Sequence, residues 1–206
     1  MGSTTVTERD ARHLERAIEL AATARGLTSP NPMVGAVIVK SGSVIGEGLH
    51  VRAGEAHAER AALMACEDDP AGSTLYVSLE PCCHEGLTPP CTDAIVEAGI
   101  ARVVVGSDDP TPKASGRGLG ILRDEGIEVE TVEGELAAAA RLLNQPFRKH
   151  ARTGRPLVIF KSAMTSTARS RPAPVTLSGS PGNRVGRGRT AGARSATPWR
   201  WGSTPR

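Results

Sequence analysis

The sequence predicts an α/β fold: a three-layer sandwich around a central mixed sheet, followed by a disordered C-terminal tail. Segments with helical apolar spacing alternate with short runs of β-branched residues, which is typical of such layered folds. The run from Arg102 to Val105 is apolar after its first residue, as expected of a strand buried on both faces. Two short strands between residues 34 and 50 flank a Gly-containing turn and add an antiparallel hairpin.

The first third of the chain predicts a helix, the hairpin and a second helix. Thr7, with Asp10 three residues later, can cap the first helix, and Gly26 ends it. Ser41 and Gly42 form a tight turn between the two strands. The predicted elements are a helix to about Arg25, strands at Val34 to Val39 and Val44 to His50, and a helix from His57 to Cys66.

The rest of the folded part continues the alternation of strands and helices. Gly99 and the polar residues near 106–116 interrupt the apolar pattern and mark connections between elements. The predicted strands are Leu75 to Val77, Arg102 to Val105, Ile127 to Val132 and Leu157 to Lys161, and the predicted helices run from Cys91 to about Ala98, from Leu119 to Asp124 and from Glu135 to about Leu143.

Charge and composition change abruptly near residue 165. Residues 166–206 hold eight Arg, no Lys and no acidic residue, whereas the preceding 165 residues hold 17 basic and 22 acidic residues. The net charge is therefore +8 for this tail and −5 for the rest of the chain, which together give the overall +3. The tail has no hydrophobic periodicity and too few apolar residues for a core, which predicts disorder. A frameshift is one hypothesis for its origin, and a basic tail that binds nucleic acid non-specifically is the alternative.

The compartment follows from the N-terminus and the cysteines. The first 17 residues contain no apolar run of signal-peptide length, and no later stretch is long enough to cross a bilayer, so we expect a cytoplasmic protein. The four cysteines lie at positions 66, 82, 83 and 91. In a reducing compartment such clustering favours a metal site over disulfides.

One stretch carries the candidate chemistry. His57, Cys82 and Cys91 offer one imidazole and two thiols, a plausible set of three zinc ligands that leaves one coordination position open for water. Glu59, two residues after the histidine, is placed to accept and return the protons of that water. Isolated residues of these types are often plain surface or core residues, but three in this order favour a metal. Cys83 and His84 are competing ligands, but the Pro-Cys pattern favours Cys82 over Cys83.

The order of these residues resembles a known family. Nucleobase deaminases carry His-x-Glu followed by Pro-Cys-x-x-Cys, but here EPCCHEGLTPPC at 80–91 places eight residues between Cys82 and Cys91. This spacing resembles the deaminase domain of the bifunctional riboflavin-biosynthesis deaminase/reductase, as do NPMVGAVIVK at 31–40, AGEAHAE at 53–59 and DPTPKASGRG at 109–118. The resemblance covers roughly residues 10 to 165 and implies a cytidine deaminase-like fold.

The resemblance also implies domain boundaries, a substrate and a pocket. It divides the chain into a zinc-dependent deaminase domain at 1–153, a vestigial start of a reductase domain at 154–165 and the basic tail. It implies Zn²⁺ as cofactor and a phosphorylated ribosylaminopyrimidine as the small-molecule substrate. The pocket positions it implies are Asn31, His50, Asp109 and Arg117. Leu87 and Thr111 depart from the family, which usually has a basic residue and Asn there, and losing a cation weakens a phosphate contact.

Two alternatives stay open beside this reading. A deaminase of cytidine, guanine or tRNA adenosine is disfavoured because those relatives generally keep only two residues between the cysteines. A catalytically silent remnant folded around zinc is favoured by Leu87 and the unpatterned tail, and opposed by the intact set of metal residues and Glu59. No membrane partner is expected, nucleic acid is disfavoured as a partner, and assembly into a homo-oligomer is left open.

Overall fold

The computed structural model describes residues 6–86 and 88–161, which form six helices and five strands. The strands are β1 (Gly35–Lys40), β2 (Ser43–Leu49), β3 (Thr74–Val77), β4 (Arg102–Val105) and β5 (Glu128–Thr131). The helices are α1 (Glu8–Thr23), α2 (Ala58–Met64), α3 (Cys91–Glu97), α4 (Arg117–Asp124), α5 (Gly134–Leu143) and α6 (Gln145–Thr153). All the predicted elements as far as Leu143 are present, with ends shifted by a few residues.

The strands form one mixed sheet in the order β2-β1-β3-β4-β5. β1 pairs antiparallel with β2 and β3, whereas β3, β4 and β5 are parallel to one another. In the hairpin turn, Ser41 and Gly42 both have positive φ, 52° and 82°, the backbone that two-residue hairpin loops require. The predicted mixed sheet is confirmed.

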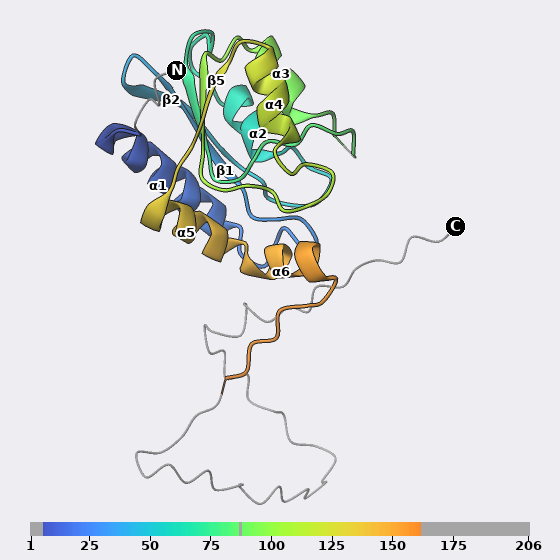
Figure 1. The fold of residues 1–206 in the computed structure, drawn as a ribbon. Helices are drawn as coiled ribbons and strands as arrows, with labels where there is room; N and C mark the ends of the chain where they lie inside the picture. Colours follow the sequence, from blue (N-terminus) through green and yellow to red (C-terminus); the bar gives the residue numbers. More distant parts are fainter. Residues whose placement is uncertain (1–5, 87, 162–206) are drawn as a thin grey trace, which may run out of the picture.

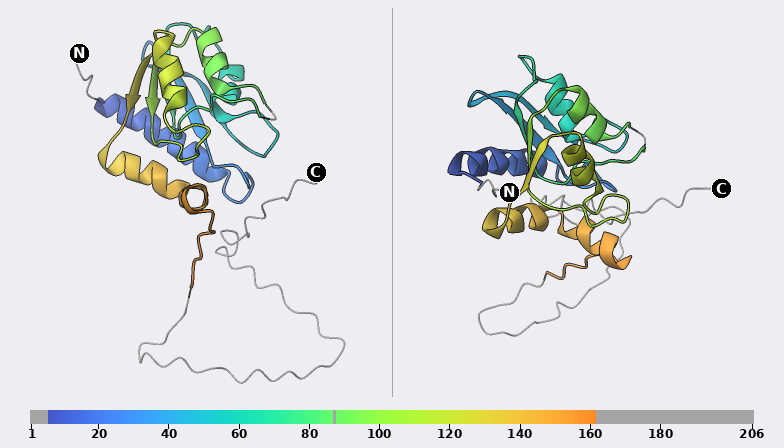
Figure 2. Two further views of the ribbon diagram at one scale, coloured as in Figure 1. Left: turned by 45° about the vertical axis from the view of Figure 1, so that its right-hand side comes forward. Right: turned by 45° about the horizontal axis from the view of Figure 1, so that its top comes forward.

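Helices cover both faces of this sheet and complete three layers. Figures 1 and 2 show α1 and α5 on one face and α2, α3 and α4 on the other. β4 separates the two apolar cores: Val103 and Val105 pack toward α2, α3 and α4, and Val104 packs toward α1 and α5. All three are fully buried, which confirms the expectation drawn from the valine run.

The packing of α1 and α2 determines where the metal residues lie. Thr7 and Asp10 form a reciprocal capping box that begins α1, as predicted. α2 lies directly on β2 because glycines occupy two strand positions beneath it. A Cβ atom at Gly48 would lie 2.2 Å from the backbone nitrogen of Ala62, so a side chain there would displace the helix. This contact fixes the helix end from which His57 projects.

A buried ion network joins α1 to the far half of the sheet. The Asp10 carboxylate accepts hydrogen bonds from the Tyr76 hydroxyl at 2.7 Å and from the Arg102 guanidinium at 2.7 Å. Arg102 also pairs with Glu130 at 2.7 Å. The pKa of Asp10 is held well below its usual range: burial alone would raise it, but the hydrogen bonds from Arg102, Tyr76 and Thr7 outweigh burial.

The structure differs from the sequence-based expectations after residue 143. Helix α6 was not predicted, although Pro146 in its first turn and the αL residue Gly154 after its end are ordinary helix signals. The predicted strand from Leu157 to Lys161 is wrong: the segment pairs with no strand among the described residues, and Val158, Ile159 and Phe160 are 72 to 88% exposed. Strand-forming residues without a neighbouring strand edge cannot satisfy their backbone in a ladder.

Two further points complete the fold. No helix among residues 6–86 and 88–161 is long and apolar enough to span a membrane. The predicted disordered tail at 166–206 and the end of the predicted reductase start lie outside the described residues, so both remain predictions.

Candidate metal centre

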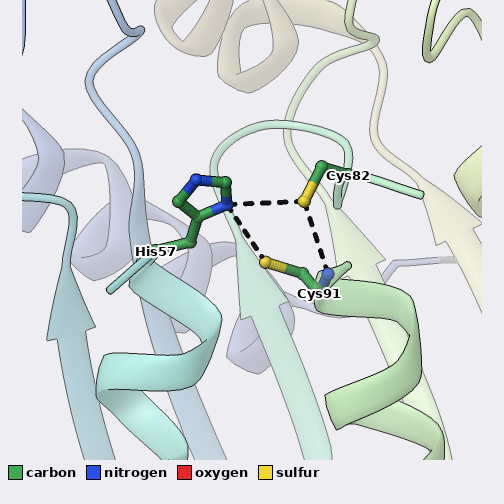
Figure 3. A group of neighbouring side chains, drawn as sticks. All are labelled: His57, Cys82 and Cys91. Atoms are coloured by element: carbon green, nitrogen blue, oxygen red, sulfur yellow. Dashed lines mark hydrogen bonds between the residues drawn. The ribbon is translucent and has the colours of Figure 1, made fainter. Parts of the chain in front are cut away.

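Three donor atoms converge between the ends of two helices and a loop (Figure 3). His57 is the N-cap residue of α2, Cys82 lies in the loop after β3, and Cys91 is the first residue of α3. The Nδ1 atom of His57 lies 3.4 Å from Cys82 Sγ and 3.3 Å from Cys91 Sγ. All three donor atoms lie within 4.8 Å of one another.

Backbone contacts close the loop that separates the two cysteines. The amide of Cys91 donates to the Cys82 carbonyl at 3.0 Å and lies 3.3 Å from Cys82 Sγ, and the amide of Thr92 donates to the same carbonyl. Arg60 on α2 donates to the Pro90 carbonyl at 2.9 Å. The contact of Arg60 with Pro90 therefore holds the histidine helix and the cysteine loop together without involving the donor atoms.

The electrostatics of the cluster favour a thiolate at Cys82. A hydrogen bond with Cys91 and a second with His57 lower the pKa of the Cys82 thiol to about 4, although burial opposes them. The same contact with Cys82 raises the pKa of His57, against the effect of burial. Thiolate is the form in which cysteine binds metals.

The donor set fits zinc. Two soft sulfur donors and one imidazole match the ligands that zinc prefers, and a set of three protein donors is characteristic of catalytic rather than structural zinc sites. The competing residues lie outside this cluster: the Cys83 thiol contacts the Lys113 carbonyl at 3.8 Å, and the His84 Nδ1 atom is buried with no hydrogen-bond partner. The predicted choice of Cys82 over Cys83 agrees with this geometry.

Glu59 lies beside the donors in the first turn of α2. Its side chain is 3% exposed, and its carboxyl interacts with the Cys91 thiol. Burial, together with the negative charge at Cys82, raises the pKa of Glu59 to about 7. A group with a pKa near neutrality can both accept and return a proton at physiological pH.

A contact on the far side of the His57 ring was not predicted from the sequence. The Nε2 atom lies 3.4 Å from the hydroxyl of Thr88. When Nδ1 is the deprotonated nitrogen that faces the two cysteine sulfurs, Nε2 carries the proton and donates it to this hydroxyl. This hydrogen bond fixes the plane of the ring. Thr88 stands three residues before Cys91, and its position inside the long cysteine spacing was the available signal.

Asn31 and His50, two predicted pocket residues, contact each other. The Nδ1 atom of His50 lies 3.0 Å from the Ala56 carbonyl, and its Nε2 atom lies 3.0 Å from Asn31 Nδ2. Because a carbonyl only accepts, Nδ1 carries the proton, Nε2 accepts from Asn31, and the Asn31 carboxamide oxygen is left as an acceptor. Burial lowers the pKa of His50, in keeping with a neutral ring. The ring lies edge-on to His57, with centroids 5.2 Å apart.

Asp109 and Arg117, the other two predicted pocket residues, lie at the two ends of the loop after β4. Asp109 is partly buried, its carboxylate accepts from the Thr111 amide at 2.8 Å, and burial raises its pKa. Arg117 begins α4 and is exposed. Leu87, the main departure from the family pattern, lies outside the described residues.

A buried carboxylate that the sequence analysis left without a role holds this loop in place. Glu80 is 4% exposed and accepts hydrogen bonds from the amides of Gly116, at 2.8 Å, and Asp109, at 3.2 Å. Gly118 packs against the same loop: a Cβ atom there would lie 2.3 Å from the Pro81 carbonyl oxygen and 3.5 Å from Glu80 Oε1. Glu80 therefore joins the cysteine loop to the loop that carries Asp109. Its place directly before Pro81-Cys82 was the only sequence signal.

A second buried side chain supports the loop of Asn31. Asn144 is 2% exposed; its Oδ1 accepts from the Met33 amide and its Nδ2 donates to the Met33 carbonyl, both at 2.8 Å. It thus pairs with a backbone residue as a strand would. No local sequence pattern predicts this contact, because its partners are 111 residues apart in the sequence.

Comparisons with known proteins agree with this geometry. Residues 7–107 match the model of the cytidine and deoxycytidylate deaminase zinc-binding region. Riboflavin biosynthesis protein RibD of Actinobacillus pleuropneumoniae is 49% identical over 160 residues, 78% of this chain and 42% of that protein. RibD of Acinetobacter baumannii superposes with a TM-score of 0.68 at 47% identity, covering 72% of this chain and 41% of that one.

A third relative combines a deaminase and a reductase. A diaminohydroxyphosphoribosylaminopyrimidine deaminase/5-amino-6-(5-phosphoribosylamino)uracil reductase of Thermotoga maritima superposes with a TM-score of 0.68 at 45% identity, covering 72% of this chain and 42% of that one. The chain spans about two fifths of the length of the curated relatives it matches. Residues 7–107 therefore form a cytidine and deoxycytidylate deaminase zinc-binding region, and the chain is similar to RibD over about three quarters of its own length.

Proposed function

We propose that the chain is a zinc-dependent hydrolytic deaminase. Its substrate would be 2,5-diamino-6-ribosylamino-4(3H)-pyrimidinone 5′-phosphate, converted with water to 5-amino-6-ribosylaminouracil 5′-phosphate and ammonia. The convergence of His57, Cys82 and Cys91 beside the buried Glu59 carries the proposal. The deaminase and reductase activities of the Thermotoga maritima relative supply the choice of substrate.

His57, Cys82 and Cys91 would hold the zinc ion, and their arrangement leaves room for one further ligand. When bound, zinc supplies Lewis acidity that lowers the pKa of water toward neutrality. Thr88 would keep the His57 ring in its binding orientation through Nε2. Arg60 would hold the Cys91 end of the loop against α2 through its contact with Pro90.

Glu59 would serve first as base and then as acid. It takes a proton from the attacking water, whose oxygen bonds to the ring carbon that bears the exocyclic amine. It then returns this proton to the ring nitrogen, takes the second proton from the same oxygen and delivers it to the amine, which leaves as ammonia as the carbonyl forms. The raised pKa of Glu59 suits both roles, because neither protonation state is strongly disfavoured near pH 7.

The remaining pocket residues would select the substrate. Asn31 presents a free carboxamide oxygen to a donor on the base or ribose, and His50 fixes that orientation. Asp109 offers a carboxylate to a ribose hydroxyl or a ring N–H, and Arg117 offers a guanidinium to the 5′-phosphate. A cytoplasmic location and the division into domains at residues 153 and 165 stay predictions beside this proposal.

Ammonia release from the purified full chain tests the proposal. The ribotide is supplied with and without a zinc chelator, with cytidine and adenosine as comparison substrates. We expect turnover of the ribotide alone, abolished by the chelator and restored by added zinc. Turnover of cytidine or adenosine instead would refute the choice of substrate. About one bound zinc per chain with no turnover of any substrate would favour the silent remnant.

A variant pair isolates the role of Glu59. Glu59→Gln should retain zinc and lose at least about a hundredfold in kcat, the lower end of the contribution of a general acid or base. Glu67→Gln is the matched control, because Glu67 is an exposed carboxylate just beyond the same helix. Full activity in Glu59→Gln would contradict the assignment.

A further inference from the structure

A second cluster of charged side chains lies where α5 and α6 meet the loop after β4. Three guanidinium groups surround the single carboxylate of Asp108. Arg148 donates to both carboxylate oxygens, at 2.9 and 3.0 Å, and its side chain is 7% exposed. Arg141 lies 3.5 Å and Arg152 3.7 Å from the same carboxylate. Arg148 alone therefore neutralises the charge of Asp108, and the other two arginines add positive charge that this carboxylate does not balance.

Arg141 and Arg152 leave the cluster with excess positive charge. Their side chains are 51% and 58% exposed, and their contacts with Asp108 are longer than those of Arg148. The neighbouring Lys149 adds a third cation. Cations held around one carboxylate repel one another, and an additional anion would relieve that repulsion. Guanidinium groups that converge in this way can bind a phosphate through several hydrogen bonds at once.

The segment that contains the cluster is basic, whereas the rest of the folded chain is acidic. Residues 136–161 contain six Lys and Arg and no acidic residue, whereas residues 1–135 contain 11 basic and 22 acidic residues. A basic segment on an otherwise acidic body creates a local positive potential that attracts anions. The cluster therefore lies in a basic segment of an otherwise acidic body, a setting that favours a negatively charged ligand.

The arginines line a hollow of about 840 Å³, a size that suits a small-molecule ligand. Its wall combines the cations with the apolar side chains of Ala138, Leu142 and Leu157. A ligand that matches this wall has an apolar or planar body and an anionic end. α5 lies on the opposite face of the sheet from α2 and α3, which carry the metal residues (Figures 1 and 2).

We propose that this hollow is a second binding site for a small molecule that carries a phosphate group. Arg141 and Arg152 contact the phosphate, the apolar wall contacts the body of the ligand, and Asp108 and Arg148 hold the two helices in position. The site does not depend on the proposed deaminase activity, because none of its residues belongs to the metal centre or to the substrate pocket.

Calorimetric titration of the full chain with inorganic phosphate and with phenyl phosphate tests the proposal. Wild-type protein should bind both saturably and phenyl phosphate more tightly, because its ring reaches the apolar wall. The double variant Arg141→Gln/Arg152→Gln should bind both at least about tenfold more weakly, having lost two charge-assisted contacts. Both arginines are half exposed, so the substitutions should leave the fold intact, as circular dichroism would check.

One further variant makes the outcome decisive. Arg155→Gln removes a charge from the same segment but outside the hollow, and it should bind phosphate like the wild type. Equal weakening in Arg155→Gln and the double variant would reduce the effect to general basicity and overturn the proposal. Binding unchanged in the double variant, or no binding in the wild type, would also overturn it.

Discussion

Replacing Thr88 by valine should weaken zinc binding while leaving all three metal donors in place. Valine has nearly the same shape as threonine but lacks the hydroxyl that lies 3.4 Å from His57 Nε2. Loss of such an outer partner typically costs ten- to a hundredfold in metal affinity. Because the 3.4 Å contact is long for a hydrogen bond, we expect the lower end, about tenfold, which corresponds to about 1.4 kcal/mol.

Competition with a chromophoric zinc chelator measures this change directly. Thr88→Ser is the matched control: it keeps the hydroxyl and should retain an affinity within about twofold of the wild type. The affinity does not depend on substrate, so the measurement separates zinc binding from catalysis. If Thr88→Val binds zinc as tightly as the wild type, Thr88 does not orient the His57 ring and the reasoning is refuted.

Three other predictions follow from contacts described above. Glu80→Gln leaves one acceptor oxygen where the carboxylate accepts from two backbone amides. The KM for the ribotide, measured by steady-state kinetics, should therefore rise roughly tenfold. The zinc content, measured by metal analysis, should not change. Asn144→Ala should lower the free energy of unfolding in urea by about 2 to 4 kcal/mol, because two buried backbone groups of Met33 lose their partner. The depressed pKa of Asp10 contributes stability that is complete above its unfolded-state pKa of about 4 and is lost as the pH falls below that value. The urea concentration at the midpoint of unfolding should therefore decrease between about pH 5 and 3. This decrease should be smaller in Asp10→Asn, which has no carboxylate to titrate at this position.

The sheet and most helices could be predicted because their signals are local. The valine run of β4, the capping box of α1 and the Ser41-Gly42 turn each determine a backbone conformation within a few residues. The metal donors could be predicted for a related reason: Cys91 opens a helix and His57 caps another, and both positions follow from helix periodicity. What brings them within 4.8 Å is the packing of α2 on β2, the closure of the cysteine loop on the Cys82 carbonyl and the contact of Arg60 with Pro90, which no local pattern predicts.

The errors and omissions have a common physical cause. The segment from Leu157 to Lys161 has the composition of a strand, but strand formation requires a neighbouring edge, and none of the described strands provides one. Glu80 and Asn144 act through backbone groups at Gly116 and Met33 that are distant in sequence. A buried polar side chain is recognisable as a clamp only when its partners are known.

The long spacing between the two cysteines acquires a structural role in this arrangement. With only two residues between Cys82 and the second cysteine, no residue could stand three positions before that cysteine and still belong to the loop. Eight intervening residues allow the chain to leave the site and return, so that Thr88 reaches His57 Nε2 and Pro90 offers its carbonyl to Arg60. The long cysteine loop therefore supports the histidine from the side opposite the metal donors. A shortened loop would have to obtain that support elsewhere, because the partner of the second ring nitrogen fixes the tautomer and orientation of a metal-binding imidazole.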